Sequence, residues 1–396
     1  MSDLLLSFYG DDFTGSTDAM ESLAIAGVRT VLFTQPPSPQ QLAKYPGLRA
    51  FGVAGTTRAM PPDEMERTLR PAFQAMRACG APIVHYKVCS TFDSSPTIGS
   101  IGCAIDVGAK VFETRPVPVV VGAPALGRYC VFGNLFVRNA GDTQPVRIDR
   151  HPSMSRHPMT PMTEGDIALH LAKQTSKSIA LLDVLRQSTV PEPNWLNDLT
   201  ADVVLLDLLD PAQYAAMGEL IARSGFVVGS SAVEAALVGG ARAKFAPIGP
   251  NGPILAVCGS CSPTSSRQVD WALSNGFVDA SDRPGDATKA IRAGRSAVIH
   301  TRRGRPGRDF YETIRNVLNA TKVRRVLFAG GDTSGHVAQA LGIESLEMIG
   351  ELTRGSPLCR STAPGSPADG LEITFKGGQI GGVDFFGLVQ RGTQHG

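Results

Sequence analysis

The chain has 396 residues, of which 42% are apolar, 19% are charged and 6% are aromatic. At about 100–200 residues per domain this length predicts two domains, or three at most, and the apolar share excludes a disordered chain. The 38 basic and 36 acidic residues leave a formal net charge of +2, which argues against nucleic acid or an anionic membrane as the main partner. The 43 glycines and 28 prolines indicate a chain rich in turns.

The cellular location is predicted from what the sequence lacks. No apolar run approaches the roughly 18 residues of a membrane span, and the first residues lack the cationic start and cleavage site of a secretory signal. We therefore expect a cytoplasmic protein with no membrane partner. Seven cysteines, an odd number scattered along the chain, predict reduced thiols.

The first part of the chain alternates strand-like and helical patterns. Runs rich in Val, Ile, Leu and Phe predict buried strands at residues 4–9, 28–34, 48–53, 83–88, 117–122, 179–184, 203–208 and 226–229. Residues 17–26, 62–79 and 230–238 predict helices; in the second of these, Met65, Leu69, Phe73 and Met76 recur at spacings of three and four. Such alternation predicts a mostly parallel sheet covered by helices. Residues 131–137 and 145–149 predict a hairpin-type insertion, followed by a polar loop over 151–162.

A glycine- and proline-rich stretch at 239–253 predicts the domain boundary, with domains over 1–240 and 241–396. The second domain repeats the α/β alternation. Strands are predicted at 254–258, 297–301, 325–329 and 371–375, and helices at 263–275, 309–320 and 336–341. The predicted fold class is therefore α/β in both domains.

An acidic pair, Asp11 and Asp12, follows the first predicted strand and precedes a helix. Ligands bind at the carboxyl ends of strands in open α/β sheets. Two adjacent carboxylates there can bind a hydroxyl substrate or a metal, or one of them can act as a base. The competing interpretation is that one aspartate caps the helix and the other is solvated.

A second polar turn combines Lys87, Ser90, Thr91 and Asp93 after another predicted strand. One cation, hydroxyls and a carboxylate on one turn suit a small polar anion, although a helix cap with a surface lysine would have the same composition. Arg58, after the strand at 48–53, could bind a carboxylate, and His157 in the 151–162 loop could supply an imidazole. Each of these two residues alone could equally be structural.

Three glycine-rich turns in the second domain follow predicted strands, at residues 258–262, 330–335 and 376–382. Glycines let backbone N–H groups approach an anion, and a following helix N-terminus adds partial positive charge. The three turns together therefore predict a nucleotide. None has the P-loop pattern, and the Cys258-x-x-Cys261 pair lacks the context of a redox or zinc motif.

Six motifs in this order resemble those of the four-carbon acid sugar kinase family along nearly the whole chain. They are Asp11-Asp12-Phe13-Thr14-Gly15, Lys87-Val88-Cys89-Ser90-Thr91-Phe92-Asp93-Ser94, the HPMTPM loop at 157–162, Gly259-Ser260-Cys261-Ser262, Gly330-Gly331-Asp332-Thr333-Ser334-Gly335 and Lys376-Gly377-Gly378. The resemblance implies two α/β domains with the active site in the interdomain cleft. The first domain would bind a sugar acid and the second ATP, and phosphate would pass to the terminal hydroxyl of a four-carbon acid of the threonate, erythronate or 3-oxo-tetronate class.

The resemblance also implies roles for individual residues. The sugar-acid side comprises Asp11, Asp12, Arg58, Lys87, Ser90, Thr91 and Asp93. The ATP side comprises Ser260, Ser262, Gly330, Gly331, Asp332, Thr333, Ser334, Gly377 and Gly378. We expect catalysis to depend on Asp12, which would orient or deprotonate the acceptor hydroxyl, and on Lys87, which with Arg58 would hold the substrate carboxylate. Asp332 is the alternative base or the Mg²⁺ partner.

Two other functions remain open at this point. A non-catalytic sugar-acid or nucleotide sensor would bind the same ligands without turnover. A nucleotide-dependent oxidoreductase would use the glycine turns for pyrophosphate, but no G-x-G-x-x-G motif follows a strand. The KGGQIGG turn at 376–382 departs from the KSGNFG type of some relatives, so the acid and its stereochemistry stay open, as does the oligomeric state, a homo-oligomer included.

Overall fold

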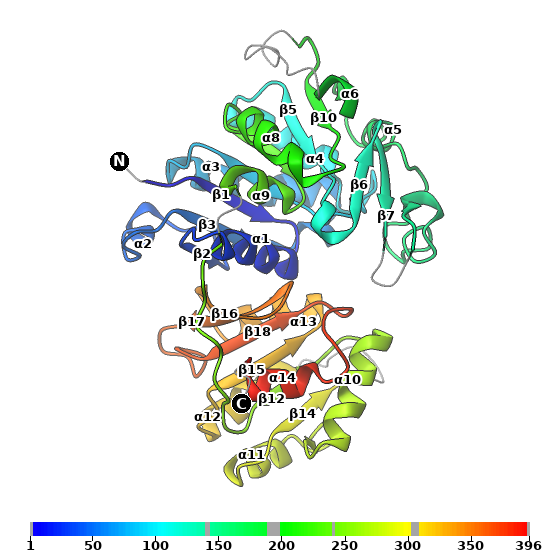
Figure 1. Cartoon of the computed structure of the whole chain (residues 1–396). Coiled ribbons are helices and arrows are strands. Elements are labelled where there is room, and N and C mark those ends of the chain that lie inside the picture. The colour runs from blue at the N-terminus through cyan, green and yellow to red at the C-terminus, as the bar shows by residue number, and fades with distance from the viewer. Residues whose placement is uncertain (1–2, 139–142, 188–198, 240–241, 302–308, 394–396) are drawn as a thin grey trace. The chain divides into compact units, whose positions relative to one another are not determined.

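The computed structural model describes residues 3–138, 143–187, 199–239, 242–301 and 309–393, apart from the side chains of Asp309 and Asp332. The chain forms two compact units (Figure 1). The first unit comprises residues 1–11, 26–29 and 36–242, and the second comprises 12–25, 30–35 and 243–396. All seven cysteines are free. Within the described residues, no helix has both the length and the apolar character needed to span a membrane.

The first unit is built on a parallel sheet with strand order β3-β1-β4-β11-β5-β10-β9. Most of these strands are fully buried, as expected for a parallel sheet covered on both faces. The strands are β1 (Leu6–Gly10), β3 (Ala50–Ala54), β4 (Val84–Lys87), β5 (Val117–Val120), β9 (Ile179–Leu182), β10 (Val203–Leu206) and β11 (Phe226–Gly229).

Helices α3 and α4 of the first unit pack against each other, and α8 packs against α9 (Figure 1). The predicted amphipathic face of α3 is confirmed, because Met65, Leu69, Phe73 and Met76 are all fully buried. The helices of this unit are α2 (Pro39–Leu42), α3 (Pro62–Ala78), α4 (Ile101–Phe112), α5 (Ile167–Leu171), α6 (Val184–Gln187), α8 (Tyr214–Ile221) and α9 (Ala232–Val238).

The predicted insertion is a separate antiparallel sheet of β6 (Arg128–Val131), β7 (Asn134–Val137) and β8 (Val146–Arg147). The turn between β6 and β7 falls at Phe132–Gly133, inside the 131–137 stretch of the predicted insertion. The backbone N–H groups of Phe132 and Gly133 both donate to the buried Asp207 carboxylate, at 2.6 and 2.9 Å. A carboxylate about 75 residues further along the chain therefore stabilises the turn.

The second unit has the strand order β13-β14-β12-β15-β18-β17-β16-β2. The pairs from β13 to β18 are parallel, and those from β18 to β2 are antiparallel. The strands are β2 (Thr30–Phe33), β12 (Leu255–Cys258), β13 (Val278–Asp279), β14 (Ala297–His300), β15 (Arg325–Ala329), β16 (Ser345–Thr353), β17 (Ser356–Thr362) and β18 (Glu372–Lys376). The helices are α1 (Phe13–Ile25), α10 (Pro263–Ser274), α11 (Gly285–Arg292), α12 (Asp309–Ala320), α13 (Gly331–Ala340) and α14 (Phe385–Arg391).

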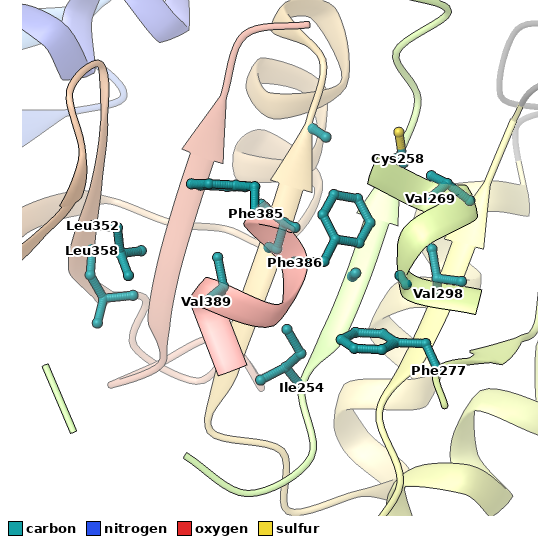
Figure 2. Close-up of a cluster of buried hydrophobic side chains, with 14 of the residues drawn as sticks. Ile254, Cys258, Val269, Phe277, Val298, Leu352, Leu358, Phe385, Phe386 and Val389 are labelled. Atoms are coloured by element: carbon teal, nitrogen blue, oxygen red, sulfur yellow. The ribbon is translucent and has the colours of Figure 1, made fainter. Parts of the chain in front are cut away.

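The core of the second unit fixes α10 and α14 against the parallel strands. Figure 2 shows Phe385, Phe386 and Val389 of α14 beside the side chains of the neighbouring strands. Val269 of α10 and Cys258 at the end of β12 belong to the same buried cluster. This packing holds the carboxyl end of β12 and the start of α10 in place, which is where the first glycine turn lies.

Two N-terminal segments belong to the second unit, and the sequence does not predict this. Strand β2 pairs antiparallel with β16, with Leu32 opposite Leu346, although the pattern of 28–34 suggested a parallel strand of the first domain. Helix α1 packs against α13 and β17. The β16–β17 hairpin that receives both segments was also absent from the predicted elements.

A buried carboxyl attaches α1 to that hairpin. Glu21 is 2% exposed and accepts the backbone N–H of Gly355, in the β16–β17 turn, at 2.5 Å. Burial raises the pKa of Glu21 to about 8, with the N–H of Gly355 opposing that shift. The side chain is therefore accommodated mainly in its neutral form.

This burial predicts a pH-dependent stability. The pKa of Glu21 is higher in the folded chain than in the unfolded chain. The contribution of Glu21 to the free energy of unfolding is therefore fully present below the unfolded pKa of about 4.5 and is lost as the pH rises to about 8. Glu21→Gln should therefore raise the Tm more at pH 8.5 than at pH 5. The exposed Glu219→Gln on α8 is the matched control. A Glu21→Gln shift equal at both pH values in thermal denaturation would contradict the assignment.

Candidate active site

The first half of the site lies at the carboxyl edge of three neighbouring strands, β3, β1 and β4. Strand β1 pairs with both of the others, so Gly10 is level with Ala54 and with Lys87. Asp11 follows β1 directly, and its N–H donates to the carbonyl of Lys87 at 2.9 Å. The sheet thus brings together Asp11, the Lys87 turn and the Arg58 segment, which are separate motifs in the sequence.

Asp11 and Arg58 form a two-point ion pair. Arg58 Nε lies 3.1 Å from Asp11 Oδ2, and Nη2 lies 2.9 Å from Oδ1. The Asp11 side chain is 7% exposed, compared with 27% for Arg58. A bidentate pair fixes the plane of the guanidinium, and the backbone N–H of Arg58 also donates to the carbonyl of Asp11. Asp11 is therefore neither solvated nor a helix cap, and it determines where Arg58 points.

The polar turn after β4 is buried and is joined to the 151–162 loop through Asp93. Thr91 Oγ1 donates to Asp93 Oδ1 at 2.5 Å, and Thr160 Oγ1 donates to Oδ2 at 3.2 Å. The N–H of Thr160 donates to Nδ1 of His157 at 3.2 Å. The Asp93 carboxylate thereby places the His157 loop beside the Lys87 turn.

The same turn contains backbone strain. Phe92 has a φ of 55° although it is not glycine, and its side chain is fully buried. A residue in this conformation persists only where its surroundings hold it. Here Ser94 contacts Nε2 of His170 at 2.9 Å, and burial lowers the pKa of His170 to about 4, which keeps the imidazole neutral. Ser90 and Lys87 are buried on the same turn.

Asp12 belongs to the second unit, where it caps α1. Its Oδ1 accepts the N–H of Gly15 at 2.6 Å, and its Oδ2 lies 3.4 Å from the hydroxyl of Thr14. This is the usual geometry of an N-cap. The helix begins at Phe13, not at residue 17 as the pattern predicted. The capping interpretation thus applies to Asp12. Its expected role in orienting or deprotonating the acceptor hydroxyl stays a prediction.

The three glycine turns of the second unit meet at the carboxyl ends of β12, β15 and β18, which are neighbours in the sheet. A Cβ added to Gly259 would lie 1.9 Å from Thr333 Oγ1, and one added to Gly378 would lie 2.7 Å from Ser260 Oγ. The Ser262 hydroxyl donates to the carbonyl of Gly378. Only glycine permits such close approach at these positions. The three turns, at residues 258–262, 330–335 and 376–382, therefore pack together, and we call them the glycine assembly.

The second of these turns differs from the prediction, because α13 begins at Gly331 and not at residue 336. Gly330 makes the turn with a φ of 121°, after which Gly331, Asp332, Thr333 and Ser334 form the first helical turn. The Ser334 hydroxyl is buried and donates to the carbonyl of Gly330 at 2.7 Å. The Asp332 side chain lies outside the described part of the structure.

Helix α1 starts beside this assembly. A Cβ on Gly331 would lie 3.9 Å from Thr14 Oγ1, and one on Gly335 would lie 3.7 Å from Phe13 Cβ. The Phe13 ring packs on Phe375 of β18, with centroids 4.7 Å apart. The Asp12 cap is therefore part of the same end of the second unit as the glycine turns.

Comparison with known proteins finds a different domain family for each of two parts of the chain. Residues 6–237 match the model of a sugar-binding N-terminal domain, and residues 277–386 match that of a nucleotide-binding C-terminal domain. The chain belongs to the four-carbon acid sugar kinase family. It is 41% identical, over 98% of its length and 94% of the relative's, to a Paraburkholderia graminis protein named 3-oxo-isoapionate kinase. A Methylobacterium radiotolerans protein named 3-oxo-tetronate kinase is 28% identical over 97% of this chain and 98% of that one.

Two solved structures share the fold. A Salmonella typhimurium structure matches with a TM-score of 0.83 at 22% identity, over 99% of this chain and 100% of the other. The Haemophilus influenzae protein HI1011 matches with a TM-score of 0.77 at 21% identity, over 97% and 99%. The predictions of an α/β fold and of an ATP-dependent sugar-acid kinase are thus confirmed. The sensor and the oxidoreductase gain no support.

Sequence reasoning did not identify two residues as partners of the polar turn after β4. Thr160 and His170 hold the Lys87 turn from the loop and from α5. The HPMTPM motif contained Thr160, but nothing in the local pattern indicated that its partner would be Asp93, 67 positions earlier. Long-range pairs of this kind require the fold.

The close packing of the glycine assembly predicts how an added methyl group would change the affinity for ATP. In Gly259→Ala the new methyl group would overlap Thr333 and push the first two turns apart. Overpacking of this kind costs about 1–3 kcal/mol of folding free energy. Because the proposed phosphate site needs the turns in close contact, we expect ATP affinity to fall by about tenfold or more. Titration calorimetry with ATP measures the change.

The matched control is Gly285→Ala at the start of α11. A Cβ there meets nothing within 4 Å, and alanine favours a helix over glycine by up to about 1 kcal/mol. Its affinity for ATP should equal that of the wild type. Equal affinities in Gly259→Ala and Gly285→Ala would show that the close approach of the turns is irrelevant to nucleotide binding.

Proposed function

We propose that this kinase transfers the γ-phosphoryl group of ATP to the terminal hydroxyl of a 3-oxo sugar acid of the 3-oxo-isoapionate type. The observation that carries the proposal is the 41% identity to a relative of that name, compared with 24–29% for relatives named 3-oxo-tetronate kinase. Both names describe 3-oxo acids. Threonate and erythronate, which have no 3-oxo group, become the comparison substrates.

The acid would be bound by the buried turn after β4. Lys87, 3% exposed, would supply positive charge to the substrate carboxylate. Arg58, oriented by Asp11, would act as the second cation. Ser90 and Thr91 would bind substrate hydroxyls, and Asp93 would hold Thr91 in position. Fixing the carboxylate end in this way directs the opposite end of a short chain to one place.

ATP would bind at the glycine assembly of the second unit. Ser260, Ser262, Gly377 and Gly378 line the first and third turns, and the Gly330–Ser334 segment supplies N–H groups at the start of α13. Backbone N–H groups at such turns bind phosphate without a side chain. Phosphoryl transfer requires mainly positioning and charge neutralisation.

Asp12 would serve as the base or orienting group for the acceptor hydroxyl, with Asp332 as the alternative. Mg²⁺ would neutralise phosphate charge and would enter with ATP, since this ion usually takes only one or two protein carboxylates. Among the described residues no group of three or more His, Cys, Asp or Glu side chains could hold a metal. Asp332, the Mg²⁺ partner expected from the sequence, would provide such a contact.

ADP release with a substrate panel tests the proposal. The panel contains 3-oxo-isoapionate, the 3-oxo-tetronates, D- and L-threonate and D-erythronate, each with ATP and Mg²⁺. We expect the highest kcat/KM with 3-oxo-isoapionate. Turnover confined to threonate or erythronate would overturn the substrate assignment, and binding of an acid without turnover would favour a sensor.

A further inference from the structure

A buried lysine with no assigned role lies inside the glycine assembly. Lys376 is the last residue of β18, and its side chain is 0% exposed. Burial of an ammonium group is unfavourable unless other groups compensate it. Within the described residues, no carboxylate forms an ion pair with Lys376, and its amine contacts a single hydroxyl. An apolar side chain of similar length would make the folded chain at least as stable. A functional role is therefore the better explanation for a lysine at this position.

Lys376 connects all three glycine turns. Its carbonyl accepts the N–H of Gly330, in the second turn, at 2.9 Å. Its Nζ donates to Ser265 Oγ, on the helix that follows the first turn, at 3.1 Å. Ser265 Oγ in turn donates to the carbonyl of Gly378, in the third turn, at 3.0 Å. The ammonium thus begins a chain of hydrogen bonds and polarises the bonds that follow it.

We propose that Lys376 is a positioning residue for the phosphates of ATP, supplying positive charge to the glycine assembly and holding its third turn through Ser265. This inference rests on the proposed binding of ATP at these turns. The substrate would provide the negative charge that the described surroundings of the ammonium lack. The arrangement would therefore be completed by the nucleotide.

The protonation of Lys376 provides a readout that a purely structural lysine would not share. Burial lowers the pKa of Lys376 to about 8, and the facing thiol of Cys258 on β12 is the titratable group that partly opposes this shift. Bound phosphates would raise the same pKa. ATP binding at pH 8 should therefore take up a fraction of a proton, on the order of one half, and affinity should fall as the pH rises above 8.

The experiment is titration calorimetry of the full chain with a non-hydrolysable MgATP analogue at pH 8, in two buffers of different ionisation enthalpy. Wild type should bind with proton uptake. Lys376→Met should lose the uptake and bind about 10–100-fold more weakly, the range of a lost charged hydrogen bond. Ser265→Ala should weaken binding but retain the uptake, because the ammonium remains. Lys289→Met on α11, where Lys289 is exposed, should match the wild type.

Thermal denaturation without nucleotide separates folding from binding. Lys376→Met should have a Tm equal to or above that of wild type, because a buried charge is replaced by an apolar chain. Lys376→Arg should bind the analogue with an affinity that no longer falls above pH 8. Wild-type affinity and proton uptake in Lys376→Met would overturn the role of Lys376. Failure of wild type to bind the analogue at all would overturn the proposed nucleotide site instead.

Discussion

The Asp12→Asn variant is expected to lose about two to four orders of magnitude in the rate of phosphoryl transfer, the usual contribution of a general base. Asparagine has the shape of aspartate but cannot accept the proton of the acceptor hydroxyl. It is also an equally good helix N-cap, so it should preserve the bond from the Gly15 N–H. The fold and the affinity for ATP should therefore remain near those of wild type.

Two further variants at this position separate catalysis from capping. Asp12→Ser keeps a capping oxygen and removes the carboxylate, so it should be as inactive as Asp12→Asn. Asp12→Ala removes both and should also lose about 1 kcal/mol of stability. The measurements are kcat by ADP release and Tm by calorimetry. Near-normal kcat in Asp12→Asn would exclude Asp12 as the base and leave Asp332 as the candidate.

The Lys87→Met variant is expected to raise the KM for the sugar acid by about a hundredfold, within the range for losing a buried charged contact. Lys87 ends β4 and is 3% exposed, so methionine should fill the space without unfolding the chain. Affinity for ATP should be unchanged, because the glycine assembly belongs to the other unit.

The control for this variant is Lys110→Met, which removes an exposed lysine from the last turn of α4. Lys110→Met should change neither the KM for the sugar acid nor the affinity for ATP. Steady-state kinetics with the acid varied at saturating ATP gives the comparison. An unchanged KM in Lys87→Met, or an equal loss of ATP affinity, would contradict the assignment of Lys87 to the acid.

Local patterns predicted much of the architecture. The strand predicted at 254–258 is β12 (Leu255–Cys258), and the helix predicted at 263–275 is α10 (Pro263–Ser274). Burial and periodicity are local properties, and a few residues are enough to reveal them. The same holds for the glycine turns, since each lies directly after its own strand.

Pairing between distant segments could not be predicted in this way. Strand β2 looked like its parallel neighbours, yet its partner β16 lies more than 300 positions away. The alternation of Leu346, Met348 and Leu352 in β16 was a usable signal of a half-buried strand. Nothing local, however, indicated that residues 12–25 and 30–35 would belong to the second unit.

Within the candidate site, residue types were easier to predict than their partners. The resemblance implied that Asp11 and Asp12 both lie on the sugar-acid side, but the boundary between the two units falls between them. Asp11 orients Arg58, and Asp12 caps α1. Lys376 was read only as part of a turn, because its complete burial depends on β15 and α10, which are remote in sequence.

The central claim is tested most directly by the product formed from ATP, Mg²⁺ and 3-oxo-isoapionate with the wild-type chain. Phosphorus NMR and mass spectrometry should show one equivalent of ADP and one equivalent of the acid carrying a phosphate ester on its terminal hydroxyl. ADP accompanied only by inorganic phosphate, or no ADP with this acid while threonate is phosphorylated, would contradict the account.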